Sequence, residues 1–145
     1  SRGLGDVYKR QMYNEKHNLF DRLKNLTPYV SGYLDGIIQA QLKVYGYYFI
    51  EELLKPDIID PLQKSVPAEP NKDGVETASY LYAYYFIARK LAELERKDLL
   101  SAVSKQFNTH LYTPNATPEL SEIINCGPID YYNHMPYVFN NSRIN

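Results

Sequence analysis

The chain has few of the features by which enzymes and metalloproteins are usually identified. It contains a single cysteine, Cys126, among 145 residues, which excludes a disulfide within the chain. No paired C-x-x-C or H-x-x-x-H spacing is present, so we expect no metal site. The glycine-rich GxGxxG and GxxxxGK phosphate loops are also absent, which argues against a nucleotide-dependent enzyme. No cofactor is expected.

Long hydrophobic runs and an excess of one charge are missing as well. The densest apolar stretches, 44–50 and 80–88, are much shorter than the roughly 20 residues of a membrane-spanning helix. The formal net charge is only −1, and the basic residues of 89–105 alternate with acidic ones, so there is no basic stripe for a phosphate backbone. We therefore expect a soluble protein that binds neither membrane nor nucleic acid. The cytoplasm is the default location, because no signal peptide is recognised.

Residues 1–11, SRGLGDVYKRQ, match one reading frame of a transposon-based DNA sequencing adapter over their whole length. We interpret them as a translated adapter in a sequence assembled from metagenomic reads, and not as part of the protein. On this interpretation the natural chain starts at Met12 or further upstream, and a preceding domain can be missing.

The remaining residues have the pattern of a helical domain, 12–127, followed by an irregular C-terminal arm, 128–145. Thr27 and Pro28 form a helix-start signal, and apolar residues then recur with a helical period to residue 54. A second long helical pattern begins at Val75 and runs to about residue 96. Whether it continues unbroken to residue 107 is open.

Shorter helices are expected at 15–26 and at 118–125, the second because Thr117 and Pro118 repeat the helix-start signal. Residues 56–74 contain four prolines and predict a loop with at most a short turn around 58–63. We therefore predict an all-α fold, a small helical bundle built on two long antiparallel helices with shorter flanking helices. Gly32, Gly36 and Gly46 interrupt the first long helix, which indicates close approach by a neighbouring element or a kink.

The main internal regularity is a repeated hexapeptide, YGYYFI at 45–50 and YAYYFI at 82–87. On two helices, the repeated aromatic residues would lie on equivalent faces and could pack against each other or form a subunit interface. The candidate interface residues are Tyr45, Tyr48, Phe49, Tyr82, Tyr85 and Phe86. The alternative is a pocket between the long helices, lined by Tyr47 and Tyr84, with His110 or His134 supplying acid–base chemistry.

The function favoured by the sequence is that of a non-enzymatic interaction or assembly component. Such a protein could be homo-oligomeric, or a structural protein of a virus or mobile element. One alternative is a small-ligand binder or enzyme with the tyrosine-lined pocket, and another is an inhibitor that docks a larger protein. Cys126 precedes Gly127-Pro128 and is expected to close a helix. Its pairing with a histidine cannot be derived from the sequence, because such partners meet only in space.

Overall fold

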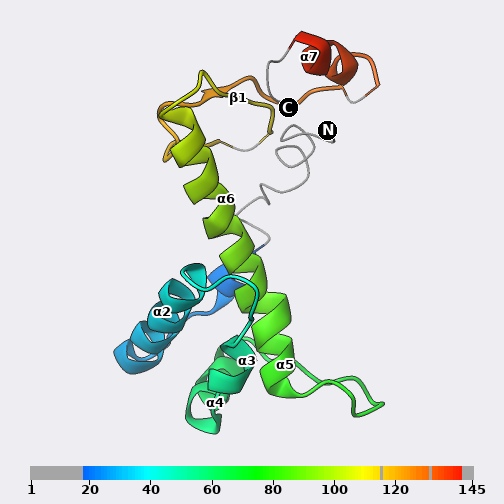
Figure 1. Ribbon diagram of the computed structural model, residues 1–145. Helices are drawn as coiled ribbons and strands as arrows, with labels where there is room; N and C mark the ends of the chain where they lie inside the picture. The colour runs from blue at the N-terminus through cyan, green and yellow to red at the C-terminus, as the bar shows by residue number, and fades with distance from the viewer. Residues whose placement is uncertain (1–17, 115, 131, 142–145) are drawn as a thin grey trace. The chain divides into compact units, whose positions relative to one another are not determined.

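The structure is a computed structural model that describes residues 18–114, 116–130 and 132–141 (Figure 1). Within these residues the chain forms two compact units, one that reaches to Ala92 and one that begins at Glu93. We call them the N-terminal unit and the C-terminal unit. The described residues are mostly helical, as the sequence predicts. The adapter-like residues 1–11 lie outside the described part of the chain.

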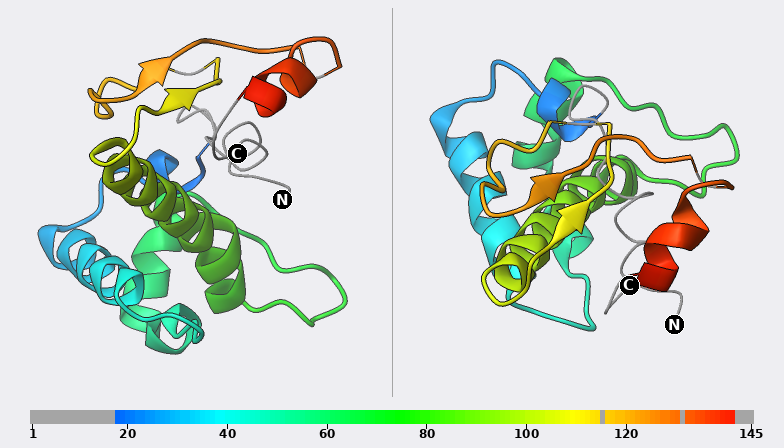
Figure 2. Two further views of the ribbon diagram at one scale, coloured as in Figure 1. Left: turned by 45° about the horizontal axis from the view of Figure 1, so that its top comes forward. Right: turned by 90° about the horizontal axis from the view of Figure 1, so that it is seen from above.

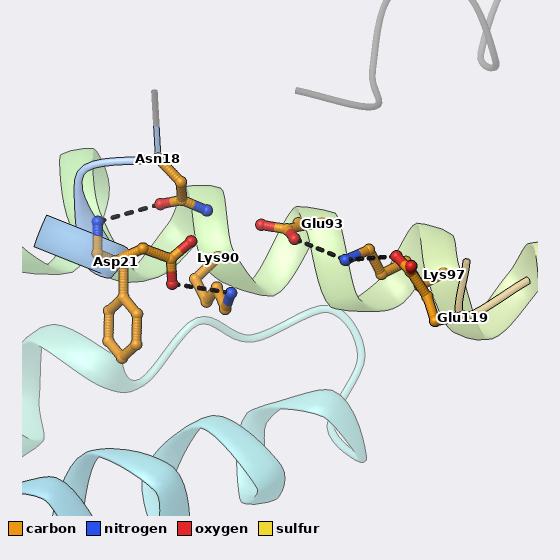
Figure 3. A network of polar contacts seen from close by, with 7 residues as sticks. Asn18, Asp21, Lys90, Glu93, Lys97 and Glu119 are labelled. Carbon is orange, nitrogen blue, oxygen red and sulfur yellow. Dashed lines mark hydrogen bonds and ion pairs between the residues drawn. The ribbon is translucent and has the colours of Figure 1, made fainter. Parts of the chain in front are cut away.

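The N-terminal unit begins with a short 3-10 helix, η2 (Phe20–Arg22), so the α-helix predicted over 15–26 is wrong for the residues that the structure describes. Asn25 has a φ of 57°, a left-handed conformation that a continuing right-handed helix does not allow. A 3.0 Å ion pair between Asp21 and Lys90 joins this segment to the long helix of the same unit (Figure 3).

Helix α2 (Pro28–Leu42) starts where the sequence predicts. The Thr27 hydroxyl accepts a hydrogen bond from the Val30 amide at 3.3 Å, and Pro28 occupies the first turn, where its missing N–H costs nothing. The apolar stripe of the helix is buried, and its members are Val30, Leu34, Ile37 and Ile38.

The prediction that this helix continues to residue 54 is wrong, because α2 ends at Leu42. Gly46 adopts a φ of +83° in the connection that follows, a conformation that glycine reaches without a steric penalty. A new short helix, α3 (Ile50–Leu53), begins four residues later. The two long antiparallel helices of the prediction therefore do not form as expected.

Helix α4 (Pro56–Ser65) occupies a segment for which the sequence predicts a loop. Pro56 lies in its first turn, where proline is tolerated, but Pro61 lies in its interior, where proline costs about 3 kcal/mol. Ile58, Ile59 and Leu62 are all buried. Since burying each aliphatic side chain contributes roughly 1.5 to 3 kcal/mol, the apolar face outweighs the proline.

The second long helical pattern forms one continuous run of three segments. Helix α5 (Ala78–Leu81) starts at Thr77, whose hydroxyl accepts from the Tyr80 amide at 3.1 Å. The run continues as a π-helix, η3 (Tyr82–Ile87), and then as α6 (Ala88–Ser104). The question that the sequence left open is thus answered in favour of a single helical run, with a π-helix inside it.

The C-terminal unit contains the later part of α6, two short strands and a final helix. Strands β1 (His110–Leu111) and β2 (Ile124–Asn125) pair in parallel (Figure 2), and no strand was predicted. Helix α7 (Met135–Asn141) lies in the segment that the sequence describes as irregular. The core of the unit is formed by Leu100, Leu111, Leu120 and Ile123.

The helix predicted over 118–125 is wrong. Two successive turns form instead, in which the Leu120 amide bonds to the Thr117 carbonyl and the Ile123 amide bonds to the Leu120 carbonyl. The next amide, that of Ile124, bonds across to the Thr109 carbonyl at 3.0 Å. The Ile124 amide is therefore used in pairing with β1 and does not form a helical hydrogen bond.

Lys97 attaches this turn to α6. Its ammonium group lies 2.9 Å from carboxylate oxygens of both Glu93 and Glu119 (Figure 3). Burial raises the pKa of Glu119, but the hydrogen bond and charge of Lys97 outweigh it and hold the pKa below its ordinary value. The Glu93 carboxylate, in a residue only 2 % exposed, is compensated by the same cation.

Candidate interaction surface

Four tyrosine rings form one contiguous group on the N-terminal unit, which we call the tyrosine cluster: Tyr48, Tyr80, Tyr84 and Tyr85. The ring centroids of Tyr80 and Tyr84 are 4.5 Å apart, those of Tyr48 and Tyr84 are 5.1 Å apart, and those of Tyr80 and Tyr85 are 6.4 Å apart. These separations lie in the range in which tilted and edge-to-face rings attract each other. Tyr84 and Tyr85 are each 39 % exposed, so the cluster reaches the surface.

The π-helix explains why three of these rings come from one short stretch of chain. In η3 the Ala88 amide bonds to the Ala83 carbonyl, five residues earlier. This wider turn places both the fourth and the fifth residue after Tyr80 within ring contact of it. The π-helix therefore brings the tyrosine rings together, in addition to extending the helical run.

Tyr48 is added to the cluster from the connection between α2 and α3. Its hydroxyl donates a hydrogen bond to the Ala83 carbonyl in η3. Burial raises the pKa of Tyr48, and the neighbouring Tyr84 and Glu51 raise it further, so the hydroxyl stays protonated and remains a donor at neutral pH.

A buried glutamine holds this connection in place. Gln41 is 6 % exposed, and its amide nitrogen donates to the carbonyls of Val44 at 3.1 Å and Tyr47 at 2.9 Å. Its amide oxygen accepts from the Phe49 amide at 3.0 Å. Three backbone groups on both sides of Tyr48 are thus bound by one side chain of α2.

The six predicted interface residues do not form one surface. Tyr48 and Tyr85 belong to the tyrosine cluster, Phe49 is half-buried, and Tyr45 is 85 % exposed. Tyr82 and Phe86 are buried, and their rings pack 4.8 Å apart. These last two residues belong to the core of the unit and not to an exposed surface.

Tyr82 shows why one face of the repeated hexapeptide is internal. Its hydroxyl donates to the Val66 carbonyl at 2.6 Å and also lies 3.1 Å from the Gln63 amide oxygen. Burial raises the pKa of Tyr82 to about 12. The residue therefore fastens the long helical run to the segment that follows α4.

The four residues of the predicted ligand pocket are divided between the two units. Tyr47 and Tyr84 are in the N-terminal unit, whereas His110 and His134 are in the C-terminal unit. The Tyr47 hydroxyl donates to the Glu52 carboxylate, and this bond, together with the carboxylate charge, raises the pKa of Tyr47. His110 contacts Cys126, with its Nδ1 atom 3.5 Å from the sulfur.

The sequence prediction missed Tyr80, which belongs to the tyrosine cluster, and Gln41, which is buried and holds the connection that carries Tyr48. Tyr80 precedes Tyr84 by four residues, a spacing that brings side chains together on a helix and could have indicated it. No such signal exists for Gln41, because its partners are backbone groups of a connection whose course the sequence does not reveal. In the described ranges, no group of three or more His, Cys, Asp or Glu side chains is arranged to hold a metal ion.

No protein-family model matches the chain, and comparisons with curated proteins and with solved structures find no match either. Among the helices for which the structure gives a position, none has both the length and the apolar composition to cross a bilayer.

Proposed function

We propose that the chain is a non-enzymatic interaction or assembly component that associates with copies of itself through the tyrosine cluster. The observation that carries this proposal is the contiguous set of four rings, two of them at the surface, held by the hydrogen bond of Tyr48 to Ala83 and by the π-helix. Tyrosine is among the residues most enriched at protein interfaces and at their energetic hot spots.

The cluster is prepared for binding before a partner arrives. A tyrosine ring loses little conformational entropy when it is bound, because it has few rotatable bonds. Here the rings already pack against one another, and Tyr48 is fixed by its bond to Ala83. Less ordering free energy is therefore lost on association than with mobile side chains.

Self-association is favoured over binding to a charged partner by the chemistry of the patch. Phenol rings present an apolar face together with a hydroxyl that both donates and accepts hydrogen bonds. Such a surface is complementary to itself, which is the requirement of a two-fold interface in which the same patch is used by both copies. A phenol ring carries no formal charge that would oppose such a contact at neutral pH.

The test is the molar mass of the full chain in solution, measured by light scattering after size exclusion over a range of concentrations. We expect a defined dimer or higher oligomer. The double variant Tyr84→Ala/Tyr85→Ala should shift it to the monomer, because it removes the two exposed rings.

Tyr29→Ala is the matched control. Tyr29 is an even more exposed tyrosine, at 64 %, on helix α2 of the same unit and outside the tyrosine cluster. It should leave the oligomer unchanged. A wild-type chain that is monomeric at every concentration, or an oligomer that survives the double substitution, would overturn the proposal.

A further inference from the structure

Three side chains with reactive or polar groups meet on the β1–β2 pair of the C-terminal unit: His110, Tyr112 and Cys126. We call them the thiol site. The parallel register pairs His110 with Ile124 and Leu111 with Asn125, and the Cys126 amide extends the pairing by bonding to the Leu111 carbonyl at 2.8 Å. His110 lies in β1 and contacts Cys126, which directly follows β2. Tyr112 directly follows β1 and interacts electrostatically with the same cysteine.

The opposite face of β1 fixes the position of the site. Leu111, between His110 and Tyr112, is completely buried in the core of the unit. His110 and Cys126 are both exposed, whereas Tyr112 is half-buried. The alternation of buried and exposed side chains therefore presents the imidazole and the thiol to solvent from an anchored strand.

The contacts of the sulfur are those of an assisted nucleophile. His110 Nδ1 lies 3.5 Å from Cys126 Sγ, so that the imidazole tautomer protonated at Nε2 can accept the thiol proton. Burial raises the pKa of Tyr112, and the charge and hydrogen bond of Cys126 raise it further. The phenol thus stays protonated and can donate to a sulfur that carries negative charge.

The backbone around the cysteine discriminates between two kinds of thiol chemistry. Acyl transfer is strongly assisted by hydrogen-bond donors that stabilise an oxyanion, and backbone N–H groups beside the nucleophile often supply them. Here the Cys126 amide is bonded to Leu111 and the Gly127 amide is bonded to the Asn125 side-chain oxygen at 2.9 Å. Thiol–disulfide exchange needs no oxyanion donors, only an accessible sulfur and a means of removing its proton.

We propose that Cys126 is a site of thiol–disulfide exchange with low-molecular-weight disulfides, and that His110 acts as its general base. As Sγ attacks one sulfur of the external disulfide, its proton passes to His110 Nδ1. A new bond forms between Sγ and that sulfur, and the original disulfide bond breaks. The leaving thiolate departs with the electron pair and takes the proton from the imidazolium. Cys126 is oxidised to a mixed disulfide, and the other half of the reagent is reduced to a thiol.

The presence of a single cysteine determines the fate of the mixed disulfide. The chain has no second cysteine, so no thiol of its own can displace the bound group. The mixed disulfide persists until an external thiol attacks it. The thiol site is therefore a reversible modification site and not a dithiol oxidoreductase centre.

Oxidised glutathione is a suitable probe, with formation of the adduct on the full chain followed by intact mass. We expect His110→Asn to slow the reaction by about tenfold or more near pH 7, as expected for loss of a general base. His134→Asn, which alters another exposed histidine of the same unit, should react at the wild-type rate, and Cys126→Ser should form no adduct.

The pH dependence of the reaction rate distinguishes a general base from a structural role of His110. Of the side chains that the structure describes, the titratable groups that interact with the sulfur are those of His110 and Tyr112. Above pH of about 8.5, where ordinary thiols ionise without help, the deficit of His110→Asn should shrink. Equal rates for wild type and His110→Asn, or a deficit of the same size at every pH, would overturn the proposal. Should the variant fail to fold, the wild type decides: its thiol must react faster near pH 7 when folded than in urea.

Discussion

Gln41 is the residue on which the geometry of the tyrosine cluster depends most directly. It replaces the helical hydrogen bonds that are lost where α2 ends, and it does so for backbone groups on both sides of Tyr48. Removing a buried side-chain amide that satisfies three backbone groups is costly. Each backbone group that is left without a hydrogen-bond partner destabilises the folded state.

We predict that Gln41→Leu lowers the free energy of unfolding by about 2 kcal/mol, since leucine fills similar space but leaves these groups unpaired. Gln39→Leu, at an exposed position of the same helix, should change it by less than about 0.5 kcal/mol. Urea denaturation followed by circular dichroism measures both. Similar values for the two variants would show that the connection is held by other contacts.

At the scale of elements, the two copies of the repeated hexapeptide adopt different structures. YAYYFI forms the π-helix η3, whereas YGYYFI runs through the connection after α2 and enters α3 only at Ile50. They differ in sequence only at Gly46 and Ala83. Gly46 has a φ of +83°, where an alanine would be strained, and Ala83 is fully buried in the helical run.

Changing a glycine to alanine should have opposite effects on stability at Gly46 and at Gly32. Gly46→Ala should destabilise the chain by roughly 1 to 2 kcal/mol, the cost of placing a Cβ in the left-handed region. Gly32→Ala, inside α2, should stabilise it by roughly 0.5 to 1 kcal/mol, because no atom lies within 4 Å of the added Cβ and alanine favours the helix. The close approach expected at Gly32 and Gly36 is therefore not found. Thermal unfolding of both variants tests the pair of signs, and two changes of the same sign would contradict the assignment.

At the scale of the whole molecule, buried Tyr82 couples the stability of the fold to high pH. Folding raises the pKa of Tyr82 from 10.0 to about 12, because the phenolate is disfavoured in its buried position. Its contribution to stability is therefore fully present below pH 10 and is lost as the pH rises towards about 12, since the unfolded chain releases the proton first.

We predict that the free energy of unfolding of the wild type falls across this range, and that Tyr82→Phe, which has no proton to lose, shows a shallower decline. Tyr85→Phe, at an exposed position of the same helical run, should keep the wild-type slope. Urea titrations at a series of pH values provide the measurement. Identical slopes for wild type and Tyr82→Phe would show that other groups determine alkaline unfolding.

Most of what the sequence determined about this protein is local. The start of α2 follows from Thr27, because a cap acts on an amide three residues away. The second helical run was expected from Val75 and begins instead at Ala78, after the cap Thr77. The predominance of helix follows from apolar periodicity, and the absence of an internal disulfide follows from the single cysteine. Tyrosines at a surface could likewise be expected from composition and the repeated hexapeptide.

The tertiary structure decided what depends on groups far apart in the chain. Helix α2 ends where Gln41 and Gly46 support a connection, and α4 forms despite Pro61 because its apolar face is buried. Residues 118–125 lose their helix to pairing with β1, a partner whose position local propensity does not encode. The same pairing brings His110 to Cys126. Which hydrogen bonds form and which side chains are buried depends on contacts between segments that are far apart in the chain. For this reason neither the tyrosine cluster nor the thiol site could be derived from the sequence alone.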